Sequence, residues 1–296
     1  MSLWSGVLPA ITTPFNADLS VDHGAVRSHV QWLISQGCTG IIPCGSLGEG
    51  ATLTPEEKAA LMRTCVSAVK APVIPGIAAL STAEAVSLAR AAEEAGCAGL
   101  MVLPPYVYSS DWREMKAHMS TVIRATKLPC LLYNNPVAYK TDFTPAQLAE
   151  LAAEHDNAVA VKESSTDARR VTGIRALLGD RLALGVGVDD CLVEGVEAGA
   201  RFWVAGLVNA FPAESVRLLE LSLAGKKDAA FALYRWFLPL LRLDTVPKFV
   251  QLIKLVQQEM GWGHERVRGP RMELVGAERE ACLRVLREAL ASRPAL

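Results

Sequence analysis

The chain has 296 residues, 51% of them hydrophobic, and a formal net charge of −1 at pH 7. This length accommodates two ordinary domains or one α/β barrel, which needs about 250 residues. The near-zero net charge argues against nucleic acids and anionic membranes as partners, and no apolar run approaches the roughly 20 residues of a membrane-spanning helix.

The cysteines, the histidines and the first residues together indicate a cytoplasmic protein without a bound metal. The seven cysteines are scattered, odd in number and free of any Cys-x-x-Cys pair, which is typical of reduced thiols. The five histidines show no zinc-ligand spacing. Residues 1–6 contain no basic segment followed by an apolar stretch, so we expect no secretory signal.

Short apolar runs alternate with amphipathic stretches through the first 225 residues. Each run is bounded by Gly, Pro or polar residues, as expected of strands buried on both faces of a parallel sheet. Eight evenly spaced runs and no dinucleotide-binding fingerprint predict a (β/α)8 TIM barrel over residues 1–225 rather than an open doubly wound sheet. The predicted strands are Val7–Ile11, Gly40–Cys44, Val73–Ile77, Gly99–Leu103, Cys130–Tyr133, Ala158–Val161, Leu182–Val186 and Phe202–Ala205.

Several helices of this barrel carry recognisable start and stop signals. Thr54 and Thr144 each precede a proline and have a Glu or Gln three residues later, and Ser81 has a Glu at the same distance. These patterns predict N-terminal caps. Left-handed glycines are expected where three helices end, at Gly37, Gly96 and Gly199.

The alternation of strands and helices ends after Gly225. Residues 226–243, 245–260 and 277–291 carry helical patterns with no strand between them. In the first of these, apolar side chains recur at the spacing of a helix that packs one face on a core. We therefore predict a C-terminal helical segment, residues 226–296, which covers one side of the barrel or joins subunits.

Lys162 is the strongest candidate for a catalytic residue. It follows the apolar run Ala158–Val161 and precedes a predicted helix. In a parallel barrel the functional groups lie at the carboxyl ends of the strands. Burial there lowers the pKa of a lysine and makes its neutral amine available for Schiff-base formation. The alternative is an ordinary lysine whose ammonium reaches solvent.

Polar groups follow three other predicted strands. In the loop Gly45–Glu49, glycines allow successive N–H groups and the Ser46 hydroxyl to face one carboxylate. Tyr133 ends a strand, where a phenol near an amine can donate and accept protons in alternate steps, although a core tyrosine is the alternative. Asp189 and Asp190 follow the seventh strand, and we expect them to cap the next helix rather than bind metal.

Three motifs occur in order at these strand ends: Gly45-Ser-Leu-Gly-Glu49, Tyr133-Asn-Asn-Pro136 and Val161-Lys-Glu-Ser164. Together they resemble the dihydrodipicolinate synthase / N-acetylneuraminate lyase superfamily of class I Schiff-base lyases, over essentially the whole chain. The resemblance implies that Lys162 forms the Schiff base, that Tyr133 shuttles protons, and that Ser46 with the Leu47 backbone binds the substrate's α-carboxylate. No cofactor is implied, because the protonated Schiff base is itself the electron sink.

The same strand ends supply further predicted substrate contacts. Asn135 and Tyr139 are expected to contact a substrate hydroxyl, and the remaining candidates are Gly45, Gly187 and Ala205. The expected ligand is a small 2-oxo acid or cyclic imine. Relatives are commonly tetramers built from dimers, so the resemblance also implies a homo-oligomer, either a tetramer or a dimer.

Three departures from the synthase pattern bear on the substrate. Synthases carry an arginine shortly after Tyr-Asn-x-Pro to hold a second carboxylate, whereas residues 137–142 here contain none. Leu47 replaces one of two paired threonines, and Val107 replaces the tyrosine that reaches a neighbouring active site. These changes argue against the synthase reaction and require a different proton relay.

Longer stretches resemble one subgroup, the Δ1-pyrroline-4-hydroxy-2-carboxylate deaminases of bacterial hydroxyproline breakdown. The implied reaction converts this cyclic imine and water to 2,5-dioxopentanoate (α-ketoglutarate semialdehyde) and ammonia. The alternatives are a class I pyruvate-type lyase, such as a 2-keto-3-deoxy sugar acid aldolase or a synthase-like enzyme, and a barrel that binds a ligand without catalysis. The stretches are Tyr133–Tyr139, Lys162–Ser165, Gly187–Asp190, Trp203–Val208, Leu233–Phe237 and Glu265–Arg268.

Overall fold

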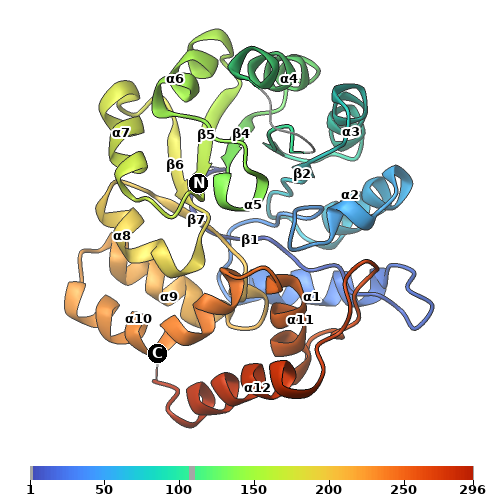
Figure 1. Cartoon of the computed structure of the whole chain (residues 1–296), viewed down its shortest axis with the longest axis vertical. Coiled ribbons are helices and arrows are strands. Elements are labelled where there is room, and N and C mark those ends of the chain that lie inside the picture. Colours follow the sequence, from blue (N-terminus) through green and yellow to red (C-terminus); the bar gives the residue numbers. More distant parts are fainter. Residues whose placement is uncertain (1–2, 107–110, 296) are drawn as a thin grey trace.

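A closed parallel barrel forms the centre of the computed structural model, which describes residues 3–106 and 111–295 (Figure 1). Within these residues seven parallel strands form one sheet in the order β1-β7-β6-β5-β4-β3-β2. An eighth segment closes the sheet, because Ile42 bridges Ala10 after β1 and Ile41 bridges Val73 ahead of β2. The predicted (β/α)8 barrel is confirmed. The strands are β1 (Gly6–Pro9), β2 (Gly76–Ile77), β3 (Leu100–Val102), β4 (Cys130–Asn134), β5 (Ala158–Glu163), β6 (Ala183–Val186) and β7 (Phe202–Ala205).

Two of the predicted strands lose most of their regular pairing. The run Gly40–Cys44 contributes only bridged residues, and Val73–Ile77 contributes only its last two residues as β2. Pro43 and Pro75 interrupt these runs. Because proline has no N–H group to donate to a neighbouring strand, regular pairing stops there.

The helices alternate with the strands and cover the outside of the barrel (Figure 1). Thr54 and Thr144 form the predicted capping boxes, and the Ser81 side chain accepts a hydrogen bond from the N–H of Glu84. The three glycines predicted at helix ends have positive φ angles. The helices of this part are α1 (His23–Ser35), α2 (Pro55–Ala68), α3 (Thr82–Glu94), α4 (Trp112–Arg124), α5 (Pro136–Tyr139), α6 (Pro145–Glu154), α7 (Arg169–Leu178), α8 (Leu192–Glu197) and α9 (Pro212–Leu223), with 3₁₀ turns η1 (Gly50–Thr52), η2 (Asp189–Cys191) and η3 (Leu207–Asn209).

Three helices follow the barrel, with no strand between them in residues 226–295. They are α10 (Lys227–Leu241), α11 (Phe249–Glu259) and α12 (Gly276–Ala291), and in Figure 1 they lie along one side of the barrel. The 3₁₀ turn η4 (Arg242–Asp244) packs against α11 and against η2, the turn that follows β6. The predicted C-terminal helices are confirmed, whereas the division of the chain at residue 225 stays a prediction.

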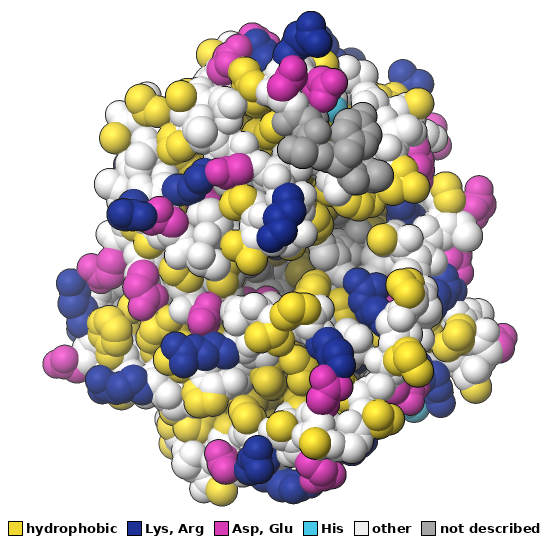
Figure 2. Space-filling view, viewed as in Figure 1, with side chains coloured by type: hydrophobic (Ala, Val, Ile, Leu, Met, Phe, Trp, Pro, Cys, Tyr) yellow, Lys and Arg dark blue, Asp and Glu magenta, His cyan; other side chains and the backbone are white. Residues whose placement is uncertain are grey.

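The strand register brings the predicted site residues to one level of the barrel. Tyr133 on β4 pairs with Lys162 on β5, which pairs in turn with Gly185 on β6. Because the strands are parallel, their carboxyl ends open at one mouth. Figure 2, in the same view as Figure 1, shows a hollow near the centre of the face that carries α5. No helix in the described residues is long and apolar enough to span a membrane.

Candidate active site

Lys162 lies inside the barrel near the end of β5, with 6% of its surface exposed. Its Nζ atom is 4.1 Å from the centre of the Tyr133 ring. Burial lowers the pKa of Lys162 to about 8, while the carboxylates of Asp244 and Asp189 act in the opposite direction. A lysine with this pKa is partly neutral near physiological pH and is therefore available as a nucleophile.

Gly187, a predicted substrate contact, packs against the lysine itself. A Cβ atom at this position would lie 2.3 Å from Cε of Lys162 and 2.1 Å from Oγ of Ser164. These separations are far below van der Waals contact, so a side chain here would displace the lysine. Glycine at position 187 is thus explained by the path of the Lys162 side chain.

The Tyr133 phenol is buried and sits among polar groups of the β4–α5 connection. Nδ2 of Asn135 donates a hydrogen bond of 3.0 Å to the Tyr133 hydroxyl oxygen. Burial raises the pKa of Tyr133, and the bond from Asn135 opposes this effect. Asn135 also caps α5, because its side chain accepts from the N–H of Ala138. The Asn-Pro pair therefore builds the turn and orients the phenol.

Tyr139, at the end of α5, connects the two sides of the site. Its hydroxyl forms a hydrogen bond with the hydroxyl of Ser46, and its ring meets the Tyr133 ring edge-on, with centroids 5.8 Å apart at 86°. The centre of the Tyr106 ring lies 5.6 Å from the centre of the Tyr139 ring. Tyr139 therefore links Tyr133, which is predicted to transfer protons, to Ser46, which is predicted to bind the carboxylate.

The loop after the eighth barrel segment folds tightly on itself. Gly50 N–H donates to the Gly45 carbonyl at 3.0 Å, and a Cβ on Gly50 would lie 2.3 Å from the Cys44 carbonyl oxygen. In the described parts of the chain, the backbone N–H groups of Ser46 and Leu47 donate to no protein group. Adjacent free N–H groups of this kind are suited to a carboxylate. The Leu47 side chain itself is buried, so only its backbone is available.

A buried ion pair anchors this loop to α11. Nζ of Lys254 on α11 lies 2.7 Å from Oε1 of Glu49, and both side chains are at most 1% exposed. The other oxygen of Glu49 accepts from the N–H of Arg268 at 3.0 Å. The C-terminal helical segment therefore fixes the last residue of the Gly-Ser-Leu-Gly-Glu motif.

The prediction that Asp189 caps the next helix is wrong. Its buried carboxylate accepts hydrogen bonds from the N–H groups of Gly206 and Leu207 and from the indole of Trp203, at 2.8–3.2 Å. The helix α8 begins at Leu192 without a side-chain cap. Asp189 therefore holds the loop after β7 beside Lys162, because free N–H groups there outcompete those of the next helix.

Asp244 is the site residue that the sequence did not predict. It belongs to η4, far from the barrel strands in sequence, and interacts electrostatically with Lys162 and Asp189. Burial raises its pKa well above the usual range of a carboxyl group. The sequence shows it only as an acidic residue shortly after the apolar run that forms α10.

The remaining predicted positions differ in what they offer a substrate. Gly45 is buried in the loop. A Cβ atom at this position would lie 3.6 Å from Cε of Met101, at ordinary van der Waals contact. Ala205 is fully buried at the end of β7 and presents no side-chain surface. Val107 lies outside the described residues. Burial raises the pKa of the Cys44 thiol to about 12, so this cysteine next to the loop is not a nucleophile.

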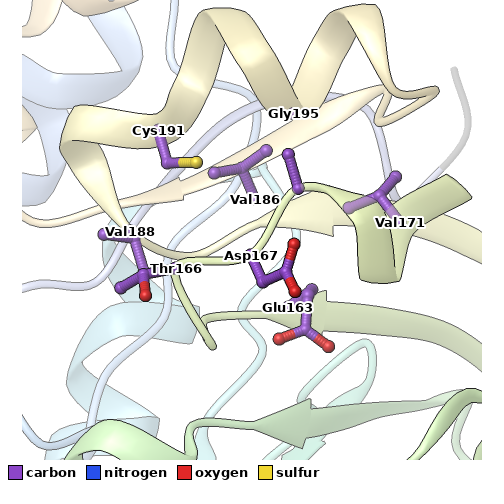
Figure 3. A pocket seen from close by; sticks show the side chains of 9 residues that line it. Glu163, Thr166, Asp167, Val171, Val186, Val188, Cys191 and Gly195 are labelled. Carbon is purple, nitrogen blue, oxygen red and sulfur yellow. The ribbon is translucent and has the colours of Figure 1, made fainter.

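A small cavity is lined in part by Glu163, the residue after Lys162 (Figure 3). Its volume of about 10 Å³ is at the lower limit for a single water molecule. It is therefore too small for a substrate. The side chains that Figure 3 labels around it are Glu163, Thr166, Asp167, Val171, Val186, Val188, Cys191 and Gly195.

Comparisons with known proteins place the chain in a family. The sequence model of the dihydrodipicolinate synthetase family matches residues 3–289. The 4-hydroxy-tetrahydrodipicolinate synthase of Agrobacterium fabrum is 31% identical over 283 residues, which cover 95% of this chain and 96% of that protein. The synthase of Geotalea daltonii is 30% identical over 292 residues, which cover 97% and 99%.

Solved structures agree with this relationship. A putative dihydrodipicolinate synthetase from Pseudomonas aeruginosa is 30% identical, with a TM-score of 0.91 over 96% of this chain and 99% of that one. The dihydrodipicolinate synthase from Cyanidioschyzon merolae, solved with lysine bound, is 28% identical, with a TM-score of 0.93 over 98% of this chain and 99% of that one. The chain therefore belongs to the dihydrodipicolinate synthetase family of class I, Schiff-base-forming lyases and aldolases.

Proposed function

We propose that Lys162 forms a Schiff base with C2 of a small substrate that carries an α-carboxylate. The observation that carries this proposal is the position of the amine, buried 4.1 Å above the Tyr133 ring with its pKa lowered to about 8. A neutral amine attacks the carbonyl or imine carbon, and the adjacent phenol moves the protons that addition and elimination require.

The carboxylate of the substrate is proposed to bind at the Ser46–Leu47 turn. Two backbone N–H groups are free there among the described residues, and they are preorganised because Glu49 is anchored from behind. This placement orients C2 toward Lys162, at the opposite side of the barrel mouth. Proximity and orientation of this kind supply much of the rate enhancement of an enzyme.

We further propose that the proton relay lies within one chain. The hydroxyl of Tyr139 is bonded to that of Ser46, and its ring contacts Tyr133. Protons that Tyr133 takes from the substrate then pass toward Ser46 and the carboxylate turn. No second tyrosine from a neighbouring subunit is needed for this arrangement.

The specific reaction that we propose is the deamination of Δ1-pyrroline-4-hydroxy-2-carboxylate. Position 138, in the segment where synthases carry an arginine for a second carboxylate, is an exposed alanine, and the next residue, Tyr139, turns its hydroxyl toward Ser46. A site with one carboxylate-binding turn suits a substrate with one carboxylate. This cyclic imine has one, and a 4-hydroxyl group besides.

The proposed reaction conserves atoms and electrons and requires no cofactor. Lys162 adds to C2, the ring nitrogen leaves C2 as an amine that stays attached to C5, and loss of a C3 proton gives an enamine. The enamine expels the 4-hydroxyl group as water. Rearrangement to the C5 imine and hydrolysis of both imines with two waters release ammonia and 2,5-dioxopentanoate and restore the lysine.

A pyruvate-type lyase or synthase is the second candidate, and the comparisons favour it. Both relatives from Agrobacterium fabrum and Geotalea daltonii are named 4-hydroxy-tetrahydrodipicolinate synthase, and neither is named a deaminase. This candidate uses the same Lys162, Tyr133 and carboxylate turn. It differs in the second substrate, for which the site lacks the arginine of the synthases.

One set of assays separates the two candidates. The purified protein is incubated with Δ1-pyrroline-4-hydroxy-2-carboxylate, and ammonia and the semialdehyde are measured; parallel samples test pyruvate-dependent formation of 4-hydroxy-tetrahydrodipicolinate and cleavage of 2-keto-3-deoxygluconate. Ammonia release that is lost in Lys162→Met supports the deaminase. Turnover only in a pyruvate-dependent assay overturns it in favour of the second candidate.

We also propose that the protein is a homo-oligomer, a dimer or a tetramer. A structure described as a monomeric dihydrodipicolinate synthase variant has the same fold, with a TM-score of 0.90, so the fold alone is compatible with either state. Sedimentation of the purified chain distinguishes them. A monomer at assay concentration would contradict the proposal.

A further inference from the structure

The C-terminal segment brings a carboxylate into the barrel mouth beside Lys162. Asp244 ends η4, which packs against the turn η2 after β6. Its Oδ1 atom lies against Gly206, since a Cβ on that glycine would be 2.1 Å from this oxygen. Both Lys162 and Tyr133 lie close enough to interact with it electrostatically. A group from outside the barrel strands therefore reaches both predicted catalytic residues.

The two carboxylates beside Lys162 differ in their partners. Asp189 is satisfied by Trp203, Gly206 and Leu207, so it is committed to holding the loop after β7. Asp244 accepts no hydrogen bond from any residue in the described parts of the chain, and it remains partly exposed. The free oxygens of Asp244 are therefore available to a bound substrate.

The surroundings of Asp244 favour its protonated form. Burial and the charges of Asp189 and Asp190 raise the pKa of its carboxyl group, while the Lys162 ammonium acts against them. Asp190, unlike Asp244, has a charged partner, because its Oδ2 atom lies 3.4 Å from Nε of Arg242. A carboxyl group whose pKa is raised in this way is suited to donate a proton as a general acid.

We infer that Asp244 is a further catalytic residue, the acid that protonates the 4-hydroxyl group of the substrate as it leaves. The inference rests on the deaminase function proposed above. The enamine pair between C2 and C3 moves to form a C3–C4 double bond, and the C4–O bond breaks with its electrons on oxygen. The carboxyl proton joins that oxygen and water leaves. The carboxylate regains a proton from the water that then attacks C5.

Asp244→Asn tests this role, with Asp190→Asn as the matched control on a neighbouring, paired carboxylate. Each protein is incubated with Δ1-pyrroline-4-hydroxy-2-carboxylate, ammonia is measured, and borohydride-reduced adducts on Lys162 are weighed by peptide mass spectrometry. In Asp244→Asn we expect ammonia release to fall by about 10²–10⁴-fold, the usual contribution of a general acid. The trapped adduct should retain the 4-hydroxyl group and be heavier than the dehydrated adduct by one water. Asp190→Asn keeps the acid itself, so it should release ammonia much faster than Asp244→Asn and should not accumulate the heavier adduct.

Gly206→Ala is a second variant that keeps the carboxylate but displaces it, because the new methyl group occupies its place. It should accumulate the same heavier adduct. Wild-type ammonia release by Asp244→Asn, or loss of the Lys162 adduct altogether in both variants, overturns the assigned role while the deaminase function stands. Absence of ammonia release from the wild type itself overturns the proposed function, and this role of Asp244 with it.

Discussion

The Nζ atom of Lys162 lies 4.1 Å from the centre of the Tyr133 ring, and the two residues are register partners on adjacent strands. Their separation is therefore set by backbone pairing in the barrel wall rather than by a loop. Groups held in this way need little rearrangement before reaction. The pair is accordingly the rigid centre of the site, around which the residues from α5, η2 and η4 are arranged.

The rate of Schiff-base formation should rise with pH through the pKa of Lys162. Only the neutral amine attacks, and burial lowers this pKa from 10.5 to about 8. The rate of trapping with pyruvate and a reductant should therefore reach half of its maximum near pH 8 and level off above it. A midpoint close to 10.5 would show a solvated lysine and contradict the burial of the amine.

Tyr139→Phe should impair turnover without preventing the covalent step. The variant loses the hydroxyl that bonds to Ser46 but keeps the ring that packs on Tyr133. A group that transfers protons contributes about 10²–10⁴-fold to rate, so ammonia release should fall by at least about 10²-fold while the Lys162 adduct still forms. Tyr106→Phe is the control, since Tyr106 contacts Tyr139 through its ring. Equal effects of the two variants would contradict the relay.

Glu49→Gln should destabilise the fold. It leaves Lys254 without its buried counter-ion, and breaking one side of a buried pair costs about 3–5 kcal/mol. The free energy of unfolding in urea measures this loss. The matched control is Glu278→Gln, which removes an exposed pair with Lys248 and should change that free energy by at most about 1 kcal/mol. Similar small losses in both would show that the Glu49 pair is not needed.

The parts of the site that could be predicted from sequence are those with a local signal. The barrel follows from eight short apolar runs. Lys162 directly follows one of these runs, Tyr133 ends another, and Ser46 lies two residues after a third. Parallel strands place all such ends at one mouth. The structure brings these three residues together through Tyr139, whose role depended on the direction in which α5 turns.

The parts that could not be predicted depend on distant contacts. Asp189 precedes a helix, which is the usual position of a cap, but the free N–H groups after β7 bind it instead. Asp244 reaches the mouth only because η4 packs against η2. The shortened strand pairing at Pro43 and Pro75 could have been expected, since proline cannot donate to a ladder.

The location of the covalent adduct decides whether Lys162 is the nucleophile. The protein is incubated with pyruvate, or with Δ1-pyrroline-4-hydroxy-2-carboxylate, reduced with borohydride, digested and examined by mass spectrometry. We expect one adduct on Lys162, its loss in Lys162→Met, and its retention in Lys58→Met, which replaces another buried lysine. An adduct on a different residue, or none with either compound, would contradict this role of Lys162.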